Sequence, residues 1–436
     1  MSINTKPLTR LNIFISLLLL SIGSLLIYFY QLEEDQAYMG IVPISQINNA
    51  SYWLILLVWL GLSTFIFPKT ITYPSDIFIL IYLLGSTIWS ASYWPITGYL
   101  DEYKAILLMI ILLFPLLSIK VANTISSRLF TRRKTELQYK KNSLPKFLVF
   151  FLFLAFVFSY AIAGHNGDLS LDVGYFRRMT GRESFDGHLL TSYLFQMSVN
   201  GFAPLLAYYS GLNKSYQHLV AAMLFSVYAF WLIGLKAPFL NNTLMFVVGY
   251  MVRTRLIENF PKWLTKILIS YFVLALIEIY INQYSIIVDY GFRRAVMVVA
   301  QIQGYFFDAM WQMDGISCIW AGLDFDNFKS PEFLIGLQYF NDQENNANTN
   351  AFQHQIAING ILGYSLVIIG NTFFTATCDY LAMIKKNQYG FALCFILAFL
   401  MIEQAFTTAL ASSGVFLCLL LTIILSNDKN LTRYDN

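Results

Sequence analysis

The residues of this chain best suited to chemistry are a few cations that stand apart from the other basic residues. They are Arg177, Arg178, Arg182, Lys236, Arg293 and Arg294. A guanidinium group offers a rigid fork of donors and keeps its charge, so the two arginine clusters suit a phosphate or pyrophosphate group. An alternative for the first cluster is a solvated loop whose arginines pair with nearby acids. An alternative for Lys236, in its Gly-Leu-Lys-Ala-Pro turn, is a side chain that only reaches towards water.

A second set of polar residues suits a sugar hydroxyl. The run 345–354 is rich in asparagine and ends at His354. An amide side chain both donates and accepts, so Asn348 and Asn350 could orient hydroxyl groups, or the run could simply cap the next helix through Asn350. His354 is the candidate general base, with a purely structural histidine as the alternative. The other candidates for that role are His165, His188 and Asp289.

Long apolar runs must position these residues. The chain has 436 residues, of which 57% are hydrophobic and 12% charged, whereas soluble domains are about 25% charged. Runs near the ~20 residues that cross a bilayer predict about twelve transmembrane helices and an all-α polytopic membrane protein. The predicted spans are 11–30, 51–67, 76–91, 104–121, 146–163, 189–210, 219–235, 239–252, 267–281, 356–382, 391–408 and 409–426, in a single integral membrane domain over 1–436.

The distribution of lysine and arginine predicts the topology. If the N-terminus is cytoplasmic and the spans alternate, most basic residues fall on the cytoplasmic side, as the positive-inside rule requires. Both termini are then cytoplasmic. The isolated cations fall on the outer side, mostly in two loops, 164–188 and 283–355. Such exceptions indicate an anionic ligand on the outer face.

The second outer loop is long and rich in aromatic residues, which indicates an ordered, functional segment. Residues 295–310 are apolar enough for a helix, interrupted by polar residues. We predict an interfacial or re-entrant helix with the Arg293–Arg294 pair at its start.

Several classes of protein lose support. The four cysteines have no CxxC spacing, and the four histidines have no metal-ligand spacing. Nucleotide-binding and zinc-protease motifs are absent from the sequence. No metal, no cofactor and no nucleic-acid partner is therefore predicted.

The order of these features resembles the Wzy-type O-antigen polymerases, or oligosaccharide repeat-unit polymerases. The matching pieces are Tyr175-Phe176-Arg177-Arg178, Asn200-Gly201-Phe202-Ala203-Pro204, the Lys236 turn, Arg293-Arg294 with Tyr305-Phe306-Phe307, Asn348-Thr349-Asn350-Ala351-Phe352, Asn359-Gly360-Ile361-Leu362-Gly363 and the helix pair around 407–414. They cover the last two-thirds of the chain.

The resemblance implies a GT-C-like fold in the bacterial inner membrane and a glycosyltransferase site that faces the periplasm. Such enzymes transfer a growing glycan from undecaprenyl pyrophosphate to a new lipid-linked repeat unit, without a metal or a nucleotide sugar. A separate protein regulates chain length. Arg178, Arg293 and Arg294 would bind the leaving pyrophosphate, supported by Lys236, Arg177 and Arg182. His354 would activate the acceptor hydroxyl.

Other functions remain open. An O-antigen ligase uses the same donor and has a similar outer loop. A lipid-linked oligosaccharide flippase has about as many helices, but its two halves resemble each other, and this chain has no evident internal repeat. A membrane acyltransferase favours a histidine within a span, whereas these histidines lie at loops or span edges. An ion-coupled transporter could use Glu403, which the sequence places within a span.

Overall fold

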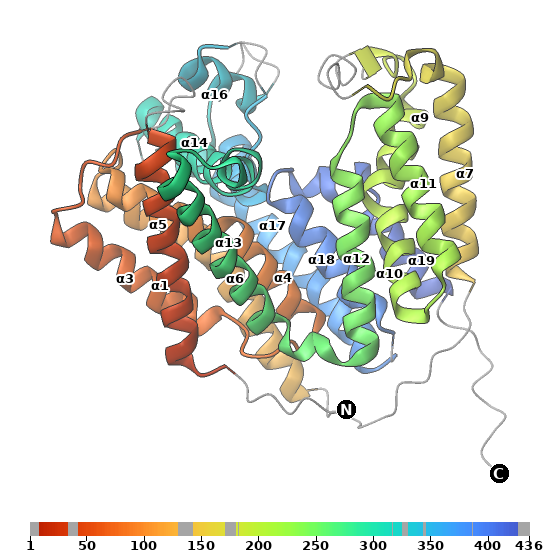
Figure 1. Ribbon diagram of the computed structural model, residues 1–436, viewed down its shortest axis with the longest axis horizontal. Coiled ribbons are helices and arrows are strands. Elements are labelled where there is room, and N and C mark those ends of the chain that lie inside the picture. The colour runs from red at the N-terminus through yellow and green to blue at the C-terminus, as the bar shows by residue number, and fades with distance from the viewer. Residues whose placement is uncertain are drawn as a thin grey trace. The chain divides into compact units, whose positions relative to one another are not determined.

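The structure is a computed structural model that describes residues 8–33, 42–129, 143–170, 180–181, 183–315, 317–324, 330–342, 346–385 and 387–425. These residues form helices and connecting segments without strands (Figure 1). The chain divides into two compact units. Unit 1 comprises Met1–Leu129, Glu258–Ala376 and Ala398–Phe406, and unit 2 comprises Phe130–Ile257, Thr377–Leu397 and Thr407–Asn436. That they act as one membrane domain stays a prediction.

Among the described residues, seven helices are long and apolar enough to cross a membrane, which supports a polytopic membrane protein. They are Arg10–Leu32, Pro74–Thr97, Glu102–Ile125, Leu144–Ala163, Tyr216–Ile233, Leu256–Asn282 and Ala351–Met383. Three shorter apolar helices are Ala50–Ile66, Tyr389–Met401 and Val415–Leu425. Each of the predicted ranges contains a helix.

Unit 1 holds most of the predicted outer-face residues. Its elements are α1 (Arg10–Ile27), η1 (Tyr28–Leu32), α3 (Ala50–Ile66), α4 (Pro74–Tyr82), η3 (Leu83–Thr87), α5 (Ile88–Thr97), α6 (Glu102–Leu129), α13 (Phe260–Asn282), η7 (Val288–Met297), α14 (Val298–Asp314), α15 (Ser317–Ala321), α16 (Pro331–Phe340) and the first part of α17 (Ala351–Met383). The short elements η1, η3 and η7 are π-helical.

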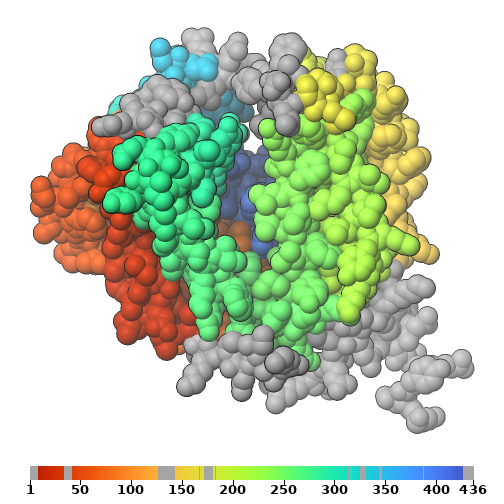
Figure 2. Space-filling view, in the orientation of Figure 1, coloured from red at the N-terminus to blue at the C-terminus, as the bar shows by residue number. Residues whose placement is uncertain are grey.

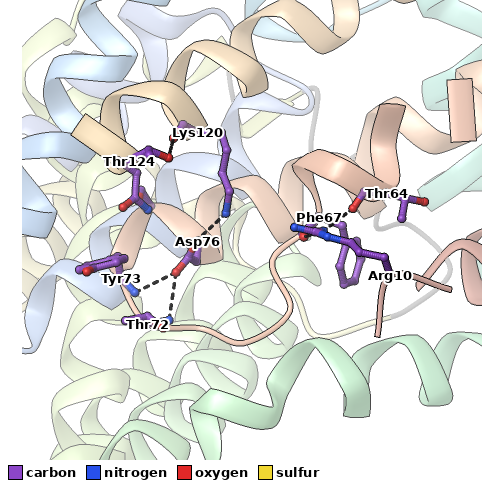
Figure 3. A network of polar contacts seen from close by, with 10 residues as sticks. Arg10, Thr64, Phe67, Thr72, Tyr73, Asp76, Lys120 and Thr124 are labelled. Atoms are coloured by element: carbon purple, nitrogen blue, oxygen red, sulfur yellow. Dashed lines mark hydrogen bonds and ion pairs between the residues drawn. The ribbon is translucent and has the colours of Figure 1, made fainter. Parts of the chain in front are cut away.

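Polar contacts join the helix ends that the sequence places on the cytoplasmic side (Figure 3). The Arg10 guanidinium donates to the carbonyl oxygens of Thr64 and Phe67, so the start of α1 caps the end of α3. Lys120 Nζ of α6 lies 3.6 Å from Asp76 Oδ1 at the start of α4. Since α1 begins where α3 ends and α4 begins where α6 approaches its end, these neighbouring helices run in alternating directions.

The opposite ends of the same helices meet as well. The Ser51 hydroxyl, at the start of α3, donates to Glu102, at the start of α6. The hydroxyl group of Tyr28, the first residue of η1, lies 3.2 Å from that of Tyr93 in the middle of α5. The alternation of direction expected from the charge pattern is therefore present in these helices.

Exposed apolar side chains follow one face of several helices. On α1 they are Leu11, Ile15, Leu19, Ile22 and Leu26. On α17 they are Leu362, Leu366, Ile369 and Phe373. A spacing of three or four residues places each set on one stripe, as expected for helices that face lipid. Figure 2 shows α1 and α13 side by side on one face of unit 1.

Unit 2 is built around close backbone contacts between helices. It contains α7 (Leu144–Ala163), η4 (Gly164–Asn166), α9 (Leu189–Met197), η5 (Ser198–Phe202), α10 (Ala203–Asn213), α11 (Tyr216–Ile233), α12 (Ala237–Thr254), η8 (Thr408–Ser412) and α19 (Val415–Leu425). A Cβ atom on Gly211 would lie 2.1 Å from the Phe246 carbonyl oxygen, and one on Gly249 would lie 2.2 Å from that of Tyr208. Only glycine allows α10 and α12 to approach so closely, as small residues do between membrane helices.

Two of the late helices depart from the predicted spans. Helix α17 is kinked at Asn359 and Gly360, where Gly360 has φ +57° and ψ −153°. Helix α18 (Tyr389–Met401) ends at Met401, so the predicted span 391–408 is interrupted. Glu403 lies in the turn between α18 and η8 and is exposed, whereas the sequence had placed it within a span.

Candidate active site

His354 forms a pair with a carboxylate that the sequence had not revealed. Its Nε2 lies 2.7 Å from Glu332 Oε1, and the two side chains are 14% and 9% exposed. His354 Nδ1 and Glu332 Oε2 are buried and have no hydrogen-bond partner within the described part of the chain. A buried polar atom without a partner requires an explanation. A ligand that donates to Nδ1 would supply one.

The electrostatics of the pair favour an ionised carboxylate. Burial opposes the charged form of Glu332, but the hydrogen bond and the charge of His354 outweigh it, so its pKa lies below the ordinary value. A glutamate in the first turn of α16 also faces the positive end of that helix. If Nε2–H donates to Glu332, Nδ1 carries a lone pair and can accept a proton.

Local sequence explains why His354 is held here. Helix α17 begins at Ala351, and Asn350 Oδ1 accepts from the backbone N–H groups of Phe352 and Gln353, each at 3.1 Å. The predicted cap is therefore confirmed. The backbone N–H of Ala347 donates to the Glu332 carbonyl oxygen at 3.3 Å. The amide-rich segment is thus pinned to α16 on one side and caps the helix of His354 on the other.

A buried amide network anchors the same turn to α14. Gln353 Nε2 donates to the Gln303 carbonyl oxygen at 2.8 Å, and Asn350 Nδ2 donates to Gln353 Oε1 at 2.6 Å. The Gln303 side chain reaches across to α5 and η3, where it accepts from the Ser90 hydroxyl and donates to that of Ser86. Because each of these side chains is buried, the network fixes the first turn of α17 in position.

The two asparagines predicted to meet sugar hydroxyls differ in accessibility. Asn350 is fully buried, and both of its amide atoms are engaged within the protein. Asn348 is exposed, between buried Ala347 and Thr349. Asn348 is thus the one of the two that presents its amide outward; a sugar contact by either remains a prediction.

Arg293 and Arg294 lie in the π-helical segment η7, which continues into α14. The helix predicted over 295–310 is therefore present and longer, from Val288 to Asp314; its placement at a membrane interface stays a prediction. Arg293 Nε lies 3.0 Å from Asp289 Oδ1. Arg294 is exposed and makes no hydrogen bond or ion pair with a residue that the structure describes. A wider π-helical turn often marks a functional site.

The remaining predicted cations belong to unit 2 or lie outside the described residues. Lys236 is exposed at the start of α12. Arg177, Arg178 and Arg182 are outside the described residues.

In the first outer loop, described residues on both sides of the undescribed part lie beside α11. Helix α11 ends just before the Lys236 turn. The Asp168 N–H donates to the Trp231 carbonyl oxygen at 2.9 Å. A Cβ on Gly181 would lie 2.4 Å from Ile233. The loop predicted over 164–188 therefore starts and ends near the end of α11, within the same unit as Lys236.

Among the residues that the structure describes, the other candidate bases have no buried carboxylate partner of this kind. His165 and His188 are exposed, and Asp289 already pairs with Arg293. Sequence reasoning missed Glu332 because twenty-two positions and a loop separate it from His354, and no spacing rule relates residues on two different helices. Its one signal was an acid in the first turn of an otherwise apolar helix.

Across the described residues, no group of three or more histidine, cysteine, aspartate or glutamate side chains could hold a metal ion. No protein family model matches the chain, and neither a curated protein nor a solved structure matches it.

Proposed function

We propose that this chain is a membrane glycosyltransferase that polymerises lipid-linked oligosaccharide repeat units, of the kind that its ordered motifs resemble. In this proposal about twelve helices cross the bacterial inner membrane in a GT-C-like fold, both termini are cytoplasmic and the site faces the periplasm. The observation that carries the proposal is the His354–Glu332 pair, whose Nδ1 is buried without a described partner.

The chemistry assigns a task to each group. The acceptor hydroxyl gives its proton to His354 Nδ1 while its oxygen attacks the anomeric carbon of the donor glycan. The bond from that carbon to the pyrophosphate oxygen breaks, and the undecaprenyl pyrophosphate leaves with the electron pair. Glu332 holds the ring and stabilises the imidazolium that forms.

The leaving pyrophosphate gains negative charge, which cationic donors must stabilise. Arg294 suits this task because it is exposed and has no partner among the described residues. Arg293 has its charge partly offset by Asp289. The further positive charge that the sequence analysis expects from Arg177, Arg178, Arg182 and Lys236 stays a prediction, and in the proposal Asn348 contacts the sugar. The hydrophobic helices accept the polyprenyl chain, and a separate regulator sets chain length.

The test is complementation of the host strain that lacks this gene, with the lipopolysaccharide ladder as the readout. The variants are His354→Ala, Arg178→Ala, Arg293→Ala and Arg294→Ala, each checked for expression. Matched controls are His218→Ala and Arg255→Ala, which remove a histidine and an exposed arginine on the predicted cytoplasmic side, outside the proposed site.

Each outcome has a distinct meaning. A ladder reduced to core plus a single repeat unit means that flipping and ligation are intact and that polymerisation is lost, as we expect. Loss of even the single repeat unit would instead indicate a flippase or a ligase. A full ladder from all four well-expressed variants would remove the catalytic assignment.

A further inference from the structure

A second carboxylate in unit 1 is surrounded by donors and is not used in the mechanism above. Asp308 Oδ2 accepts from the hydroxyl of Tyr99 at 3.0 Å, from that of Tyr339 at 2.8 Å and from Gln312 Nε2 at 2.6 Å. These donors come from the segment before α6, from α16 and from α14. Three separate parts of unit 1 therefore converge on one oxygen atom.

The other oxygen of this carboxylate is left for a further donor. Asp308 is only 3% exposed, and its Oδ1 accepts no hydrogen bond from a described residue. Oδ1 is not one of the fully buried polar atoms without a partner, so a small part of its surface stays accessible. Burial and the Asp308 charge both raise the pKa of Tyr99 and of Tyr339, so these hydroxyls stay protonated and keep donating to Oδ2. The carboxylate is thus fixed, with one oxygen ready to accept.

Aromatic rings adjoin the carboxylate. The rings of Tyr305 and Tyr339 stack at 4.3 Å between centroids, which orients the Tyr339 hydroxyl. One turn further along α14, Trp311 contacts the ring of Tyr103 edge-on at 5.7 Å. The contact of Tyr99 with Asp308 and the contact of Tyr103 with Trp311 therefore both join the region around the start of α6 to α14. The two contacts lie about one helical turn (~5.4 Å) apart.

This face is open at its rim. Tyr99 is 40% exposed and Tyr103 56% exposed, while Gln312 is exposed and Trp311 partly so. In Figure 1, α14 and α16 lie together at one end of unit 1. The sequence places both this end of α14 and the Tyr99 segment on the outer side of the membrane.

We propose that Tyr99, Tyr103, Asp308, Trp311, Gln312 and Tyr339, here called the Asp308 face, bind a saccharide ring of the repeat unit. This proposal rests on the function proposed above, because it supplies a place for a sugar of the substrate. A sugar hydroxyl donates to Asp308 Oδ1, the Gln312 amide meets a second hydroxyl, and a C–H face of the ring packs on Tyr103 and Trp311.

Other ligands fit less well. A metal ion would compete with the three protons already directed at Oδ2, and Asp308 is the one carboxylate among the six described residues of the Asp308 face. A phosphate would be repelled by Asp308, and Lys104, whose Nζ lies 5.7 Å from the centre of the Trp311 ring, already pairs with Asp101 at 3.7 Å. A neutral ligand rich in hydroxyls matches an acceptor oxygen, an amide and exposed aromatic rings.

The test measures binding of the host's repeat-unit oligosaccharide, released from its polysaccharide by mild acid and carrying neither lipid nor pyrophosphate. The purified full-length protein is titrated by calorimetry. We expect Asp308→Asn and Trp311→Ala each to weaken binding by roughly tenfold or more, as loss of a charged hydrogen bond or an aromatic platform does. The matched control is Trp263→Ala on α13. Lys266 Nζ lies 6.0 Å from the centre of the Trp263 ring, and Lys104 Nζ lies 5.7 Å from that of Trp311, so the two tryptophans have similar cation–π contacts.

The outcomes separate this proposal from the proposed function. Equal affinity in wild type, Asp308→Asn and Trp311→Ala would overturn the saccharide site, as would no binding by the wild type. Asp308→Asn could loosen the fold, but Trp311→Ala removes only a partly exposed side chain and keeps the test valid. A reduced ladder in His354→Ala with no oligosaccharide binding would leave the polymerase and remove the Asp308 face. A full ladder in His354→Ala, together with loss of oligosaccharide binding in Trp311→Ala, would remove the polymerase mechanism and keep the Asp308 face.

Discussion

Replacing Glu332 by glutamine tests whether the carboxylate or only its shape matters to His354. The new amide side chain would be nearly isosteric with the native one and could still accept from Nε2–H at the 2.7 Å position. What is lost is the negative charge that stabilises the imidazolium. A hydrogen bond to a charged group contributes about 1.5–3 kcal/mol and a neutral one about 0.5–1.5 kcal/mol, so the loss at the transition state is about 1–1.5 kcal/mol. The polymerisation rate should fall roughly five- to twelvefold, because about 1.36 kcal/mol corresponds to tenfold.

The assay is the initial rate of chain extension by the purified protein on lipid-linked repeat units, resolved by product length. His354→Ala should reduce the rate far more, by about 10²–10⁴-fold. Glu332→Gln should then add nothing in the His354→Ala background, because two residues that act as a unit are not additive. Glu102→Gln is the matched control, since Glu102 is an exposed carboxylate of the same unit. A wild-type rate for Glu332→Gln beside an inactive His354→Ala would refute the role of the carboxylate.

Three further predictions concern stability, measured as the thermal midpoint in detergent. Because the pKa of Glu332 lies below its ordinary value of 4.5, the ionised carboxylate stabilises the fold above that pH, and this stabilisation is lost as the pH falls through the folded-state pKa. The thermal midpoint of the wild type should therefore approach that of Glu332→Gln below pH 4.5. A difference between the two midpoints that stays constant with pH would contradict this. Gly360→Ala should destabilise by about 1–3 kcal/mol, since φ is +57° and the Trp320 carbonyl oxygen would lie 2.0 Å from the new Cβ; Gly61→Ala, in helix α3 with no atom within 4 Å of its Cβ, should be neutral or stabilising. Gly249→Leu should separate α10 from α12 and lower the midpoint by the equivalent of at least about 1–3 kcal/mol, and an unchanged midpoint would contradict the close packing.

Much of the helical framework followed from the sequence, because apolar runs and charge asymmetry are local properties. The cap at Asn350, the helix after Arg293–Arg294 and the alternating directions of the early helices are present in the structure. Each depended on composition over a window or on a residue next to a helix start. Such signals need no knowledge of which segments pack together.

The partners of the candidate residues could not be predicted in the same way. Glu332 meets His354, and Gln303 meets Gln353, only because separate helices pack together in a way that no spacing rule encodes. The turn at Glu403 was missed because apolar residues continue on both sides of it. The contribution of the first outer loop stays a prediction, as do the substrate and the reaction.

The π-helical start of the η7–α14 helix has a consequence for how this protein can vary. A π-helical turn holds one residue more than an α-helical turn, so it acts as an insertion absorbed without a bulge in the fold. Because the extra residue is absorbed within η7, the helix after it keeps the phase that places Gln303 in its amide network and Asp308 among its three donors. Deleting one residue from η7 would shorten the π-helical segment and change the direction of its own side chains, the arginine pair among them, while α14 kept its phase. A lineage could therefore re-aim Arg293 and Arg294 through the loss of one codon while both polar clusters stayed in place.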